Sequence, residues 1–357
     1  MAIARLASFA RVAIVNLVAV LAVIAAAELM LGSWLGDSFG SLNIPRETIR
    51  FDASDQYAEG ANIVYSRDAY GLRGKYPSPA GIDILTIGGS TTDQKSLTEG
   101  QTWQDYLAAA FLAEGHDVSV VNAGIDGQST VGHIFNFERW FPLIPGLHAR
   151  FVVAYVGIND VHVWMKDSAD RLLAASPLLR IHHAIKNNSA LYRVYRVIKG
   201  MVLARSVRLT GSTVKPETAK WTDAPNLSFD PAMVEKADAY KARLEKLVDR
   251  IRAFGATPIL ITQRRGDSRL DADGKLWGVA APAGQSNGID EALALARINA
   301  ATLETCRTRD VVCFDLAAEI ALDTADFYDL VHTKPSGARK IGLYLHRKLK
   351  DVRGVVP

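Results

Sequence analysis

Short apolar runs alternate with longer amphipathic segments over most of the chain. Five runs rich in branched and aromatic residues predict β-strands, at residues 82–87, 118–121, 151–156, 258–262 and 311–315. The third run is apolar on both faces, as expected for a central parallel strand that helices cover on both sides. Together the runs predict one buried parallel sheet.

Helical periodicity fills the segments between these runs. We expect helices over residues 102–114, 231–254, 289–306 and 337–349. In the second of them, Asp230 can cap the helix, Pro231 can begin it and Gly255 can end it. The repeated order of strand and helix predicts an α/β fold of three layers, in which the parallel sheet lies between helices.

The first 36 residues differ in kind, because they have no polar face. Arg5 and Arg11 precede an apolar stretch from residue 12 to residue 27 that only Asn16 interrupts. Such a stretch behind arginines at an N-terminus is typical of a membrane anchor or an export signal, whereas a core helix rarely has these flanks. We therefore assign residues 1–36 to an N-terminal membrane anchor or signal segment.

Two fates of this segment remain open. The run at residues 25–27, Ala-Ala-Ala, offers a cleavage site, and the apolar core is only a little longer than that of a secretory signal. We prefer an uncleaved anchor, with Glu28 at its outer interface. The positive-inside rule then places the chain beyond about Gly36 outside the cytoplasm, which is the periplasm if the cell is Gram-negative.

Two further segments interrupt the alternation. Residues 37–80 are polar and aromatic with little periodicity, so we expect an extended stalk that leads into the main domain at residues 81–357. Residues 163–229 are too long for one crossover and predict a helical insertion. Its apolar positions alternate with arginine and lysine, which indicates basic amphipathic helices that pack on the main domain or lie on a membrane. Residues 210–225 resemble a loop.

Composition allows a large core and gives no sign of a nucleic-acid partner. Of the 357 residues, 49% are hydrophobic and 22% are charged. The 41 basic and 38 acidic residues leave a formal net charge of only +3, and no long basic block is present to follow a phosphate backbone. Nucleic-acid binding therefore has no support.

Cys306 and Cys313 lie seven positions apart, one near the end of a predicted helix and one in a predicted strand. A disulfide in an oxidising compartment and two buried thiols both remain open. Neither cysteine has neighbours typical of a metal site, and the chain has no H-E-x-x-H and no G-x-x-x-x-G-K-[ST] motif. We therefore expect no metal and no cofactor.

Four polar blocks lie where predicted strands end or just before the last helix. Ligands of an open parallel sheet bind beyond the carboxyl ends of its strands, so these blocks are expected to converge. They are Gly88-Gly89-Ser90-Thr91-Thr92, Asn122-Ala123-Gly124-Ile125-Asp126-Gly127, Gly157-Ile158-Asn159-Asp160 and Asp329-Leu330-Val331-His332.

These blocks contain the groups that acyl transfer requires. A serine hydroxyl is a poor nucleophile until a histidine accepts its proton, and that histidine needs a carboxylate to orient it. Amide donors must also stabilise the negative oxygen that develops during attack. Ser90, His332 and Asp329 supply the first three groups, and the other two blocks supply candidate donors. The pattern predicts a serine hydrolase.

The order and placement of the blocks resemble the SGNH, or GDSL-like, hydrolase superfamily over about residues 82–349. The resemblance implies a five-stranded flavodoxin-like sheet, with Ser90 as nucleophile, His332 as general base and Asp329 as its orienting partner. It also implies an oxyanion hole formed by the backbone N–H groups of Ser90 and Gly127 and by the side-chain amide of Asn159.

Some assignments within the blocks stay open. The N–H of Gly124 is an alternative to that of Gly127 as oxyanion donor. We interpret Asp160 as a structural hydrogen-bonding residue rather than a second catalytic acid, and His162 as solvated or packed.

The chain departs from the superfamily in one triplet, since residues 88–90 are Gly-Gly-Ser where many members have Gly-Asp-Ser. The triad needs no side chain at that position. The Gly-Gly-Ser-Thr-Thr version, the membrane segment and the upstream Tyr-Gly-Leu-Arg-Gly at residues 70–74 look like a bacterial, membrane-anchored SGNH group.

We therefore expect a membrane-anchored, extracytoplasmic esterase, whose partner is an acyl-ester substrate. Location and the resemblance favour O-acetyl groups of an envelope polysaccharide. A polysaccharide O-acetyltransferase would use the same residues, and a lipid esterase or lysophospholipase would use the basic insertion to reach phospholipid. A non-catalytic assembly or binding module is the fourth alternative, against which the complete set of candidate catalytic groups argues.

Overall fold

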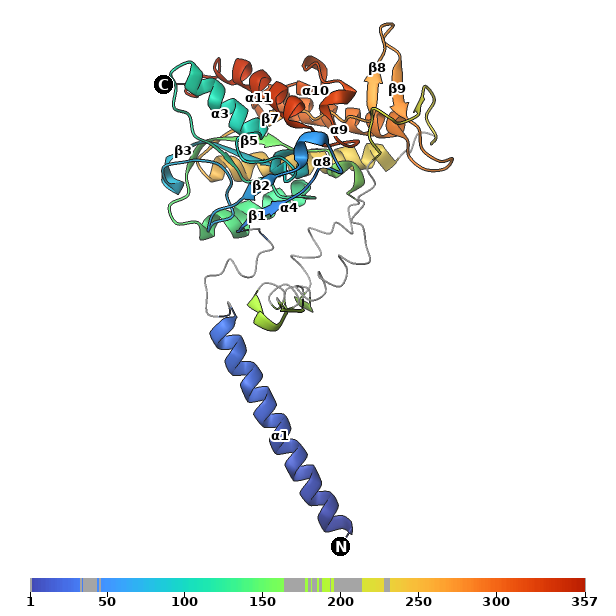
Figure 1. Cartoon of the computed structure of the whole chain (residues 1–357). Coiled ribbons are helices and arrows are strands. Elements are labelled where there is room, and N and C mark those ends of the chain that lie inside the picture. Colours follow the sequence, from blue (N-terminus) through green and yellow to red (C-terminus); the bar gives the residue numbers. More distant parts are fainter. Residues whose placement is uncertain are drawn as a thin grey trace. The chain divides into compact units, whose positions relative to one another are not determined.

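The computed structural model describes residues 2–32, 34, 44, 46–163, 214–227 and 232–356, and scattered positions between 177 and 195. The chain divides into two compact units (Figure 1). The first comprises Met1–Asn43 and Leu173–Gly211, and the second comprises Ile44–Leu172 and Ser212–Pro357.

In the first unit, helix α1 spans Ala2–Leu31. Its segment Arg11–Leu31 has a mean hydropathy of 2.5, and none of it is buried. At 1.5 Å per residue, this segment of 21 residues extends about 31 Å, which is close to the thickness of a bilayer's hydrocarbon core. The predicted apolar helix is confirmed, and it is long and apolar enough to cross a membrane.

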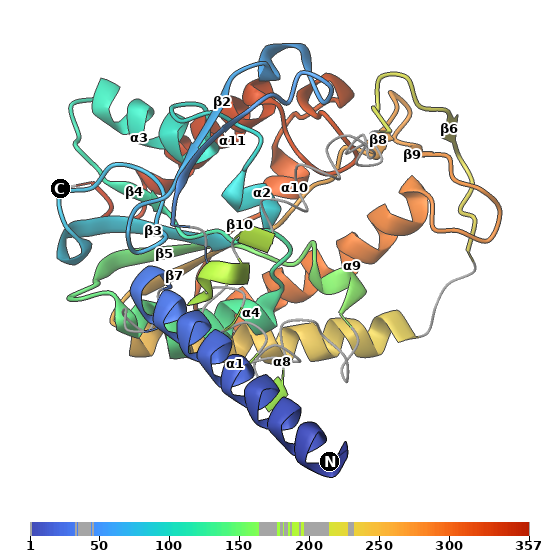
Figure 2. The same ribbon diagram turned by 60° about the horizontal axis from the view of Figure 1, so that its bottom comes forward.

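A five-stranded sheet forms the centre of the second unit, with the order β10-β7-β5-β3-β4 (Figure 2). All four neighbouring pairs are parallel. In chain order the strands are arranged 5-4-3-1-2, which is the flavodoxin-like order that we expected. The strands are β3 (Ile82–Gly88), β4 (Val120–Asn122), β5 (Ala149–Tyr155), β7 (Thr257–Ile261) and β10 (Val312–Phe314).

Helices cover both faces of this sheet (Figure 2). Helices α3 (Trp103–Ala113) and α11 (Pro335–Leu349) pack together on one face. Helices α4 (Thr130–Phe135), α8 (Ala232–Ala253) and α9 (Gly288–Arg309) lie on the other. The short helices are α2 (Ser90–Asp93), α10 (Leu316–Glu319), η2 (Ala58–Gly60), η3 (Pro79–Gly81), η4 (Asn136–Trp140), η5 (Phe141–Leu143), η6 (Asp160–His162) and η7 (Thr324–Asp326).

The sheet is buried on both faces because its strands alternate two sets of apolar side chains. Ile84, Val153 and Ile259 belong to the core cluster that also contains residues of α3 and α11. Their neighbours Leu85 and Val152 point to the opposite face and are also fully buried. The three-layer α/β/α architecture expected from the sequence is therefore confirmed.

The lead-in to the sheet is folded, so the expectation of an extended stalk over residues 37–80 is wrong for the described part from residue 46 onward. Strands β1 (Thr48–Phe51) and β2 (Ile63–Ser66) pair in antiparallel fashion. Tyr57 between the strands, Tyr65 within β2 and Leu72 after it are almost fully buried. Each strand has only four residues, which is too short for periodicity to reveal.

The structure describes only part of the insertion expected at residues 163–229. Most of the predicted basic amphipathic segment lies outside the described residues. The last part of the insertion differs from the loop that we expected, because Trp221–Thr222 forms strand β6. This strand pairs with β9 (Leu276–Val279), which also pairs with β8 (Ser268–Leu270). A strand of two residues is defined by its hydrogen bonds to a partner strand, so no local sequence pattern predicts it.

Cys306 and Cys313 form a disulfide with a Cα–Cα distance of 6.0 Å. It joins the last turn of α9 to β10 and closes the tight connection between them. Of the two readings that the sequence left open, the structure has the disulfide.

His133 in α4 is a buried, uncharged histidine. Its side chain is 1% exposed, and neither ring nitrogen has a hydrogen-bond partner among the described residues. Burial lowers the pKa of His133 to about 3, because an imidazolium would lose its hydration without gaining a partner.

This pKa makes stability depend on pH. Between about pH 3 and pH 6.5 the unfolded chain binds a proton at His133 that the folded chain does not, so stability falls as pH falls through this window. From pH 7 to pH 5 the loss from this group is about 2 kcal/mol. We predict that His133→Gln reduces the difference between urea-unfolding free energies at pH 7 and pH 5 by about that amount. An unchanged difference would contradict the prediction.

Candidate active site

The first strand of the sheet delivers Ser90 to the edge where the carboxyl ends of the strands meet. Strand β3 ends at Gly88, and α2 begins with Ser90. A side chain at Gly88 would overlap the hydroxyl of Thr92 and the carbonyl oxygen of Tyr155, so only glycine allows this sharp turn. Ser90 is therefore at the first position of a helix, where its own N–H has no helical acceptor.

The structure brings Ser90, His332 and Asp329 together in one hydrogen-bonded line. Nε2 of His332 lies 2.7 Å from Oγ of Ser90, and Nδ1 lies 2.7 Å from Oδ2 of Asp329. The other carboxylate oxygen of Asp329 accepts the backbone N–H groups of Val331 and His332, at 2.8 and 2.7 Å. The loop thus holds its own carboxylate at the correct distance from the imidazole.

The charge on Asp329 suits this arrangement. Burial by itself raises the pKa of Asp329, but hydrogen bonds from the His332 side chain and from two backbone N–H groups outweigh it, so the pKa is lowered overall. The carboxylate is ionised at neutral pH and accepts a hydrogen bond from Nδ1–H of His332. Nε2 of His332 is then free to accept the hydroxyl proton of Ser90.

Two tyrosines that the sequence did not point to support the imidazole. The ring of Tyr328 stacks on His332 with a centroid distance of 5.6 Å and an interplanar angle of 12°. Tyr57, from the lead-in, stacks on Tyr328 at 5.6 Å and donates its hydroxyl to the carbonyl oxygen of Ser96 at 2.5 Å. The stack restricts how far the histidine ring can tilt.

Asn159 also lies next to the serine turn. Its Nδ2 donates to the carbonyl oxygen of Gln128 at 2.8 Å, which leaves the second amide hydrogen for another acceptor. A side chain at Gly89 would overlap this same Nδ2. With the Asn159 amide in this position, residue 89 has no room for a side chain.

The two candidate glycines of the second block differ in what their N–H groups do. The N–H of Gly124 donates to Oδ1 of Asn122 at 2.8 Å, so it is already engaged. Gly127 has a φ of +73°, a left-handed conformation that favours glycine, and its N–H has no acceptor among the described residues. This difference favours Gly127 as the donor that faces a ligand.

Gln263, just after β7, is a second residue that the sequence did not reveal. Its side-chain amide donates to the hydroxyl of Thr91 at 2.9 Å, and its Oε1 accepts the N–H of Ile158 at 2.5 Å. It therefore ties the helix of Ser90 to the loop of Asn159. A lone glutamine after a strand has no recognisable motif.

Asp160 is structural, as we interpreted it. Its buried carboxylate accepts the N–H and the hydroxyl of Thr130 and an N–H of Arg243, the last at 2.9 Å. His162 is largely exposed and lies 3.4 Å from a carboxylate oxygen of Glu291. Neither residue contacts the line of Ser90, His332 and Asp329.

Comparison with known proteins agrees with this geometry. The sequence model of the GDSL-like Lipase/Acylhydrolase family matches residues 86–340, most of the chain. The chain belongs to this family. The resemblance noted from the sequence is thereby confirmed, and this GDSL-like protein is a serine hydrolase that cleaves esters. No curated protein matches the chain.

Several solved structures resemble this GDSL-like hydrolase weakly. A catalytic mutant of the acetylxylan esterase Axe2 from Geobacillus stearothermophilus is 15% identical, with 78% of this chain and 97% of that chain covered and a TM-score of 0.42. The M. Smegmatis aryl esterase is 11% identical, with 76% of this chain and 100% of that chain covered and a TM-score of 0.44. TesA is 14% identical, with 75% of this chain and 98% of that chain covered and a TM-score of 0.41. With TM-scores below 0.5, these similarities support no inference about the substrate.

The contact between Gly89 and Asn159 gives a direct test of the site. We predict that Gly89→Ala displaces the Asn159 amide and lowers kcat by roughly 10- to 100-fold, because one oxyanion donor is misplaced. Gly81→Ala, just before the other end of β3, is the matched control, since its new methyl group meets side-chain atoms of Pro77 and Ser78, at 3.2 and 3.6 Å, and no group of the site. Steady-state hydrolysis of p-nitrophenyl acetate measures both. Wild-type kcat in folded Gly89→Ala would contradict the assignment.

Proposed function

We propose that this GDSL-like hydrolase is a membrane-anchored, extracytoplasmic serine esterase in which Ser90 is the nucleophile, His332 the general base and Asp329 the residue that orients it. The observation on which this rests is the hydrogen-bonded line from Ser90 Oγ through both nitrogens of His332 to Asp329. Asn159 and the N–H groups of Ser90 and Gly127 form the oxyanion hole in this proposal.

The reaction follows from these positions. Oγ of Ser90 attacks the ester carbonyl while Nε2 of His332 takes the hydroxyl proton. The oxygen of the tetrahedral intermediate accepts hydrogen bonds from the amide donors, and His332 returns the proton to the departing alcohol. Water, deprotonated by His332, then attacks the acyl group, the bond between the acyl carbon and Oγ of Ser90 breaks, and His332 returns the proton to Oγ as the carboxylic acid leaves. Asp329 stays ionised and stabilises the imidazolium in both steps.

Three features support an extracytoplasmic location. The apolar helix segment Arg11–Leu31 has the length of a membrane span. Arg5 precedes that segment, so the positive-inside rule keeps the N-terminus in the cytoplasm and the rest of the chain outside. The disulfide between Cys306 and Cys313 belongs to an oxidising compartment.

For the substrate we propose O-acyl esters, acetyl esters above all, of an envelope polysaccharide. The side chains of His332 and Asp329 are 29% and 25% exposed, so the site is open enough for a group attached to a polymer. The location outside the cytoplasm supports the same choice, since envelope polysaccharides lie there.

The small sheet of β6, β9 and β8 supports a carbohydrate. The segments before β6 and β8 bond to the loop of His332, through Glu217 with Lys334 at 2.6 Å and through the N–H of Gly266 with the carbonyl oxygen of Leu330 at 2.9 Å. The register places Trp221 and Trp277 on one face of this sheet, away from α9. Indole faces are surfaces on which the C–H groups of sugar rings stack. Arg269 lies over the ring of Trp221 at 4.5 Å and Lys275 over that of Trp277 at 5.5 Å, so a sugar must displace these exposed cations or use the other face of each ring.

A lipid ester is the second candidate, and one contact in the first unit favours it. Glu28, near the end of α1, accepts the hydroxyl of Ser189 at 2.7 Å and the N–H groups of Ala190 and Leu191 at 3.1 and 3.0 Å. The side chain of Leu191 is 50% exposed. If α1 spans a membrane, this part of the insertion lies at its surface, where it would reach phospholipid.

The catalytic roles are tested by two substitutions. We predict that Ser90→Ala abolishes ester hydrolysis, because no other group can form the acyl intermediate. Asn159→Ala should lower kcat on the order of 10²–10³, the usual effect of losing an oxyanion donor. Both are measured with p-nitrophenyl acetate and the full-length protein in detergent. Normal turnover by Ser90→Ala would refute the proposal.

The substrate is tested by comparing a polymer with a small ester. We predict that Trp221→Ala and Trp277→Ala lower kcat/KM for acetate release from an acetylated polysaccharide by roughly tenfold, as expected from the loss of an aromatic contact. Hydrolysis of p-nitrophenyl acetate should stay unchanged. Leu270→Ala, on the opposite face of β8, is the control. Fatty-acid release from liposomes, with no acetate release, would favour the lipid candidate. Acetyl transfer to added sugar would show a transferase.

A further inference from the structure

Two arginines of the lead-in are buried beside the serine turn. Arg67 is 3% exposed and Arg73 is 2% exposed. Burying a guanidinium is costly unless every donor has an acceptor. The acceptors of Arg67 and Arg73 therefore identify the segments that the two side chains hold together. Arg73 lies in the Tyr-Gly-Leu-Arg-Gly motif at residues 70–74, which the catalytic line does not explain.

Arg67 joins the helix of Ser90 to the oxyanion loop. Its Nη2 donates to Oδ1 of Asp93 at 2.6 Å and also to the carbonyl oxygen of Gly124. Asp93 is the last residue of α2, and Gly124 belongs to the block that ends at Gly127. One nitrogen atom therefore connects the two segments that present Ser90 and its proposed oxyanion donor.

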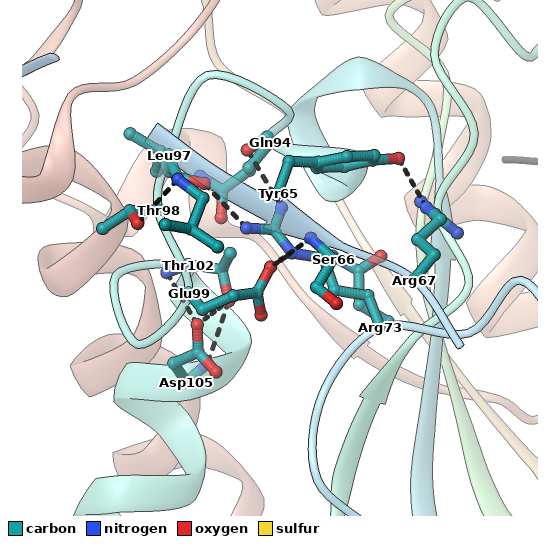
Figure 3. A network of polar contacts seen from close by, with 12 residues as sticks. Tyr65, Ser66, Arg67, Arg73, Gln94, Leu97, Thr98, Glu99, Thr102 and Asp105 are labelled. Atoms are coloured by element: carbon teal, nitrogen blue, oxygen red, sulfur yellow. Dashed lines mark hydrogen bonds and ion pairs between the residues drawn. The ribbon is translucent and has the colours of Figure 1, made fainter. Parts of the chain in front are cut away.

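The remaining donors of Arg67 fix it to the lead-in. Nε donates to the hydroxyl of Tyr65 and Nη1 to the carbonyl oxygen of Gly71, each at 2.5 Å. The Tyr65 hydroxyl in turn donates to Asp93 at 3.0 Å. Figure 3 shows the contact between Tyr65 and Arg67.

Arg73 caps the same C-terminal end of the serine helix through its backbone carbonyl groups. Its Nη1 donates to the carbonyl oxygens of Asp93 and Gln94, at 2.7 and 3.1 Å. Its Nη2 donates to the carbonyl oxygen of Leu97 at 2.7 Å (Figure 3). A helix of four residues leaves its last carbonyl groups without internal partners, so this guanidinium replaces the missing turn. Nε is held by Glu99 at 2.8 Å.

The same arginine is attached to the oxyanion loop through its backbone. The N–H and carbonyl oxygen of Arg73 pair with those of Asn122, at 3.0 and 2.7 Å. Asn122 is the last residue of β4 and the first of the oxyanion block. The motif's glycines permit this path, because Gly71 and Gly74 have φ values of +82° and +115°.

We propose that Arg67 and Arg73, which we call the arginine clamp, are positioning residues for ester hydrolysis. The clamp sets the helix of Ser90 against the oxyanion loop, so that the N–H groups of Ser90 and Gly127 converge on one point. This inference rests on the proposed roles of those two residues. Arginine is required because its planar fork donates several bonds in fixed directions, whereas a lysine ammonium cannot reach the same acceptors at once.

The test compares lysine substitutions within and outside the clamp. Arg67→Lys and Arg73→Lys keep the positive charge but lose the fork. Arg150→Lys is the matched control, since Arg150 pairs with Asp83 at 2.8 Å, near the start of β3 and β5. For each full-length variant in detergent, kcat and KM for p-nitrophenyl acetate are measured per folded molecule, together with Tm.

We expect both clamp variants to lower kcat by roughly tenfold or more, with KM changed less than about threefold, because misplaced donors weaken binding of the transition state alone. The control should keep wild-type kcat. A residue with only a structural role would lower Tm and leave kcat of the folded molecules unchanged, and that result in both variants would overturn the inference.

Tyr65→Phe covers the case in which the lysine variants do not fold. It deletes one hydroxyl, which accepts from Arg67 and donates to Asp93. A lowered kcat at unchanged KM supports the clamp, and wild-type kcat overturns it. Failure of the proposed function looks different, because Ser90→Ala would then be as active as the wild type, whereas failure of the clamp alone leaves Ser90→Ala inactive.

Discussion

The hydrogen bond between Ser90 and His332 is the contact on which the rest of the structure depends. The two residues are 242 positions apart, and Oγ of Ser90 lies 2.7 Å from Nε2 of His332. A parallel sheet makes this possible, because the carboxyl ends of its strands lie at one edge. The glycine at residue 88, the Asx-type turn at Asp329 and the stacked rings of Tyr57 and Tyr328 all restrict the same few atoms.

The site is stabilised by buried polar groups rather than by apolar packing alone. Gln263 joins the serine helix to the Asn159 loop, and Arg67 joins it to the Gly124 loop. Such contacts are directional, so they fix the angles between short segments that have little secondary structure of their own. The lead-in belongs to the catalytic unit for this reason, since Tyr57, Arg67 and Arg73 all come from it.

Much of the fold and of the candidate site could be predicted from the sequence, wherever a residue's local sequence carries the signal. Each of the five strands lies within two residues of its predicted ends, because buried parallel strands are continuous apolar runs. The positions of Ser90, Asn159 and His332 followed from strand ends together with the family resemblance. The role of the lead-in did not follow, because β1 and β2 are short and their partners are distant. Tyr328 and Gln263 were missed for a similar reason, since single side chains without a motif gain their meaning only from contacts.

The most direct test of the account is covalent labelling, which shows which residue a serine-reactive probe modifies and whether that reaction needs the imidazole of His332. A fluorophosphonate probe reacts with a serine whose hydroxyl is activated by a neighbouring imidazole. After incubation of the full-length protein with the probe and proteolysis, mass spectrometry should find the adduct on Ser90 in the wild type and no adduct in His332→Ala. Labelling of another residue, or equal labelling of Ser90 without the imidazole, would contradict the account.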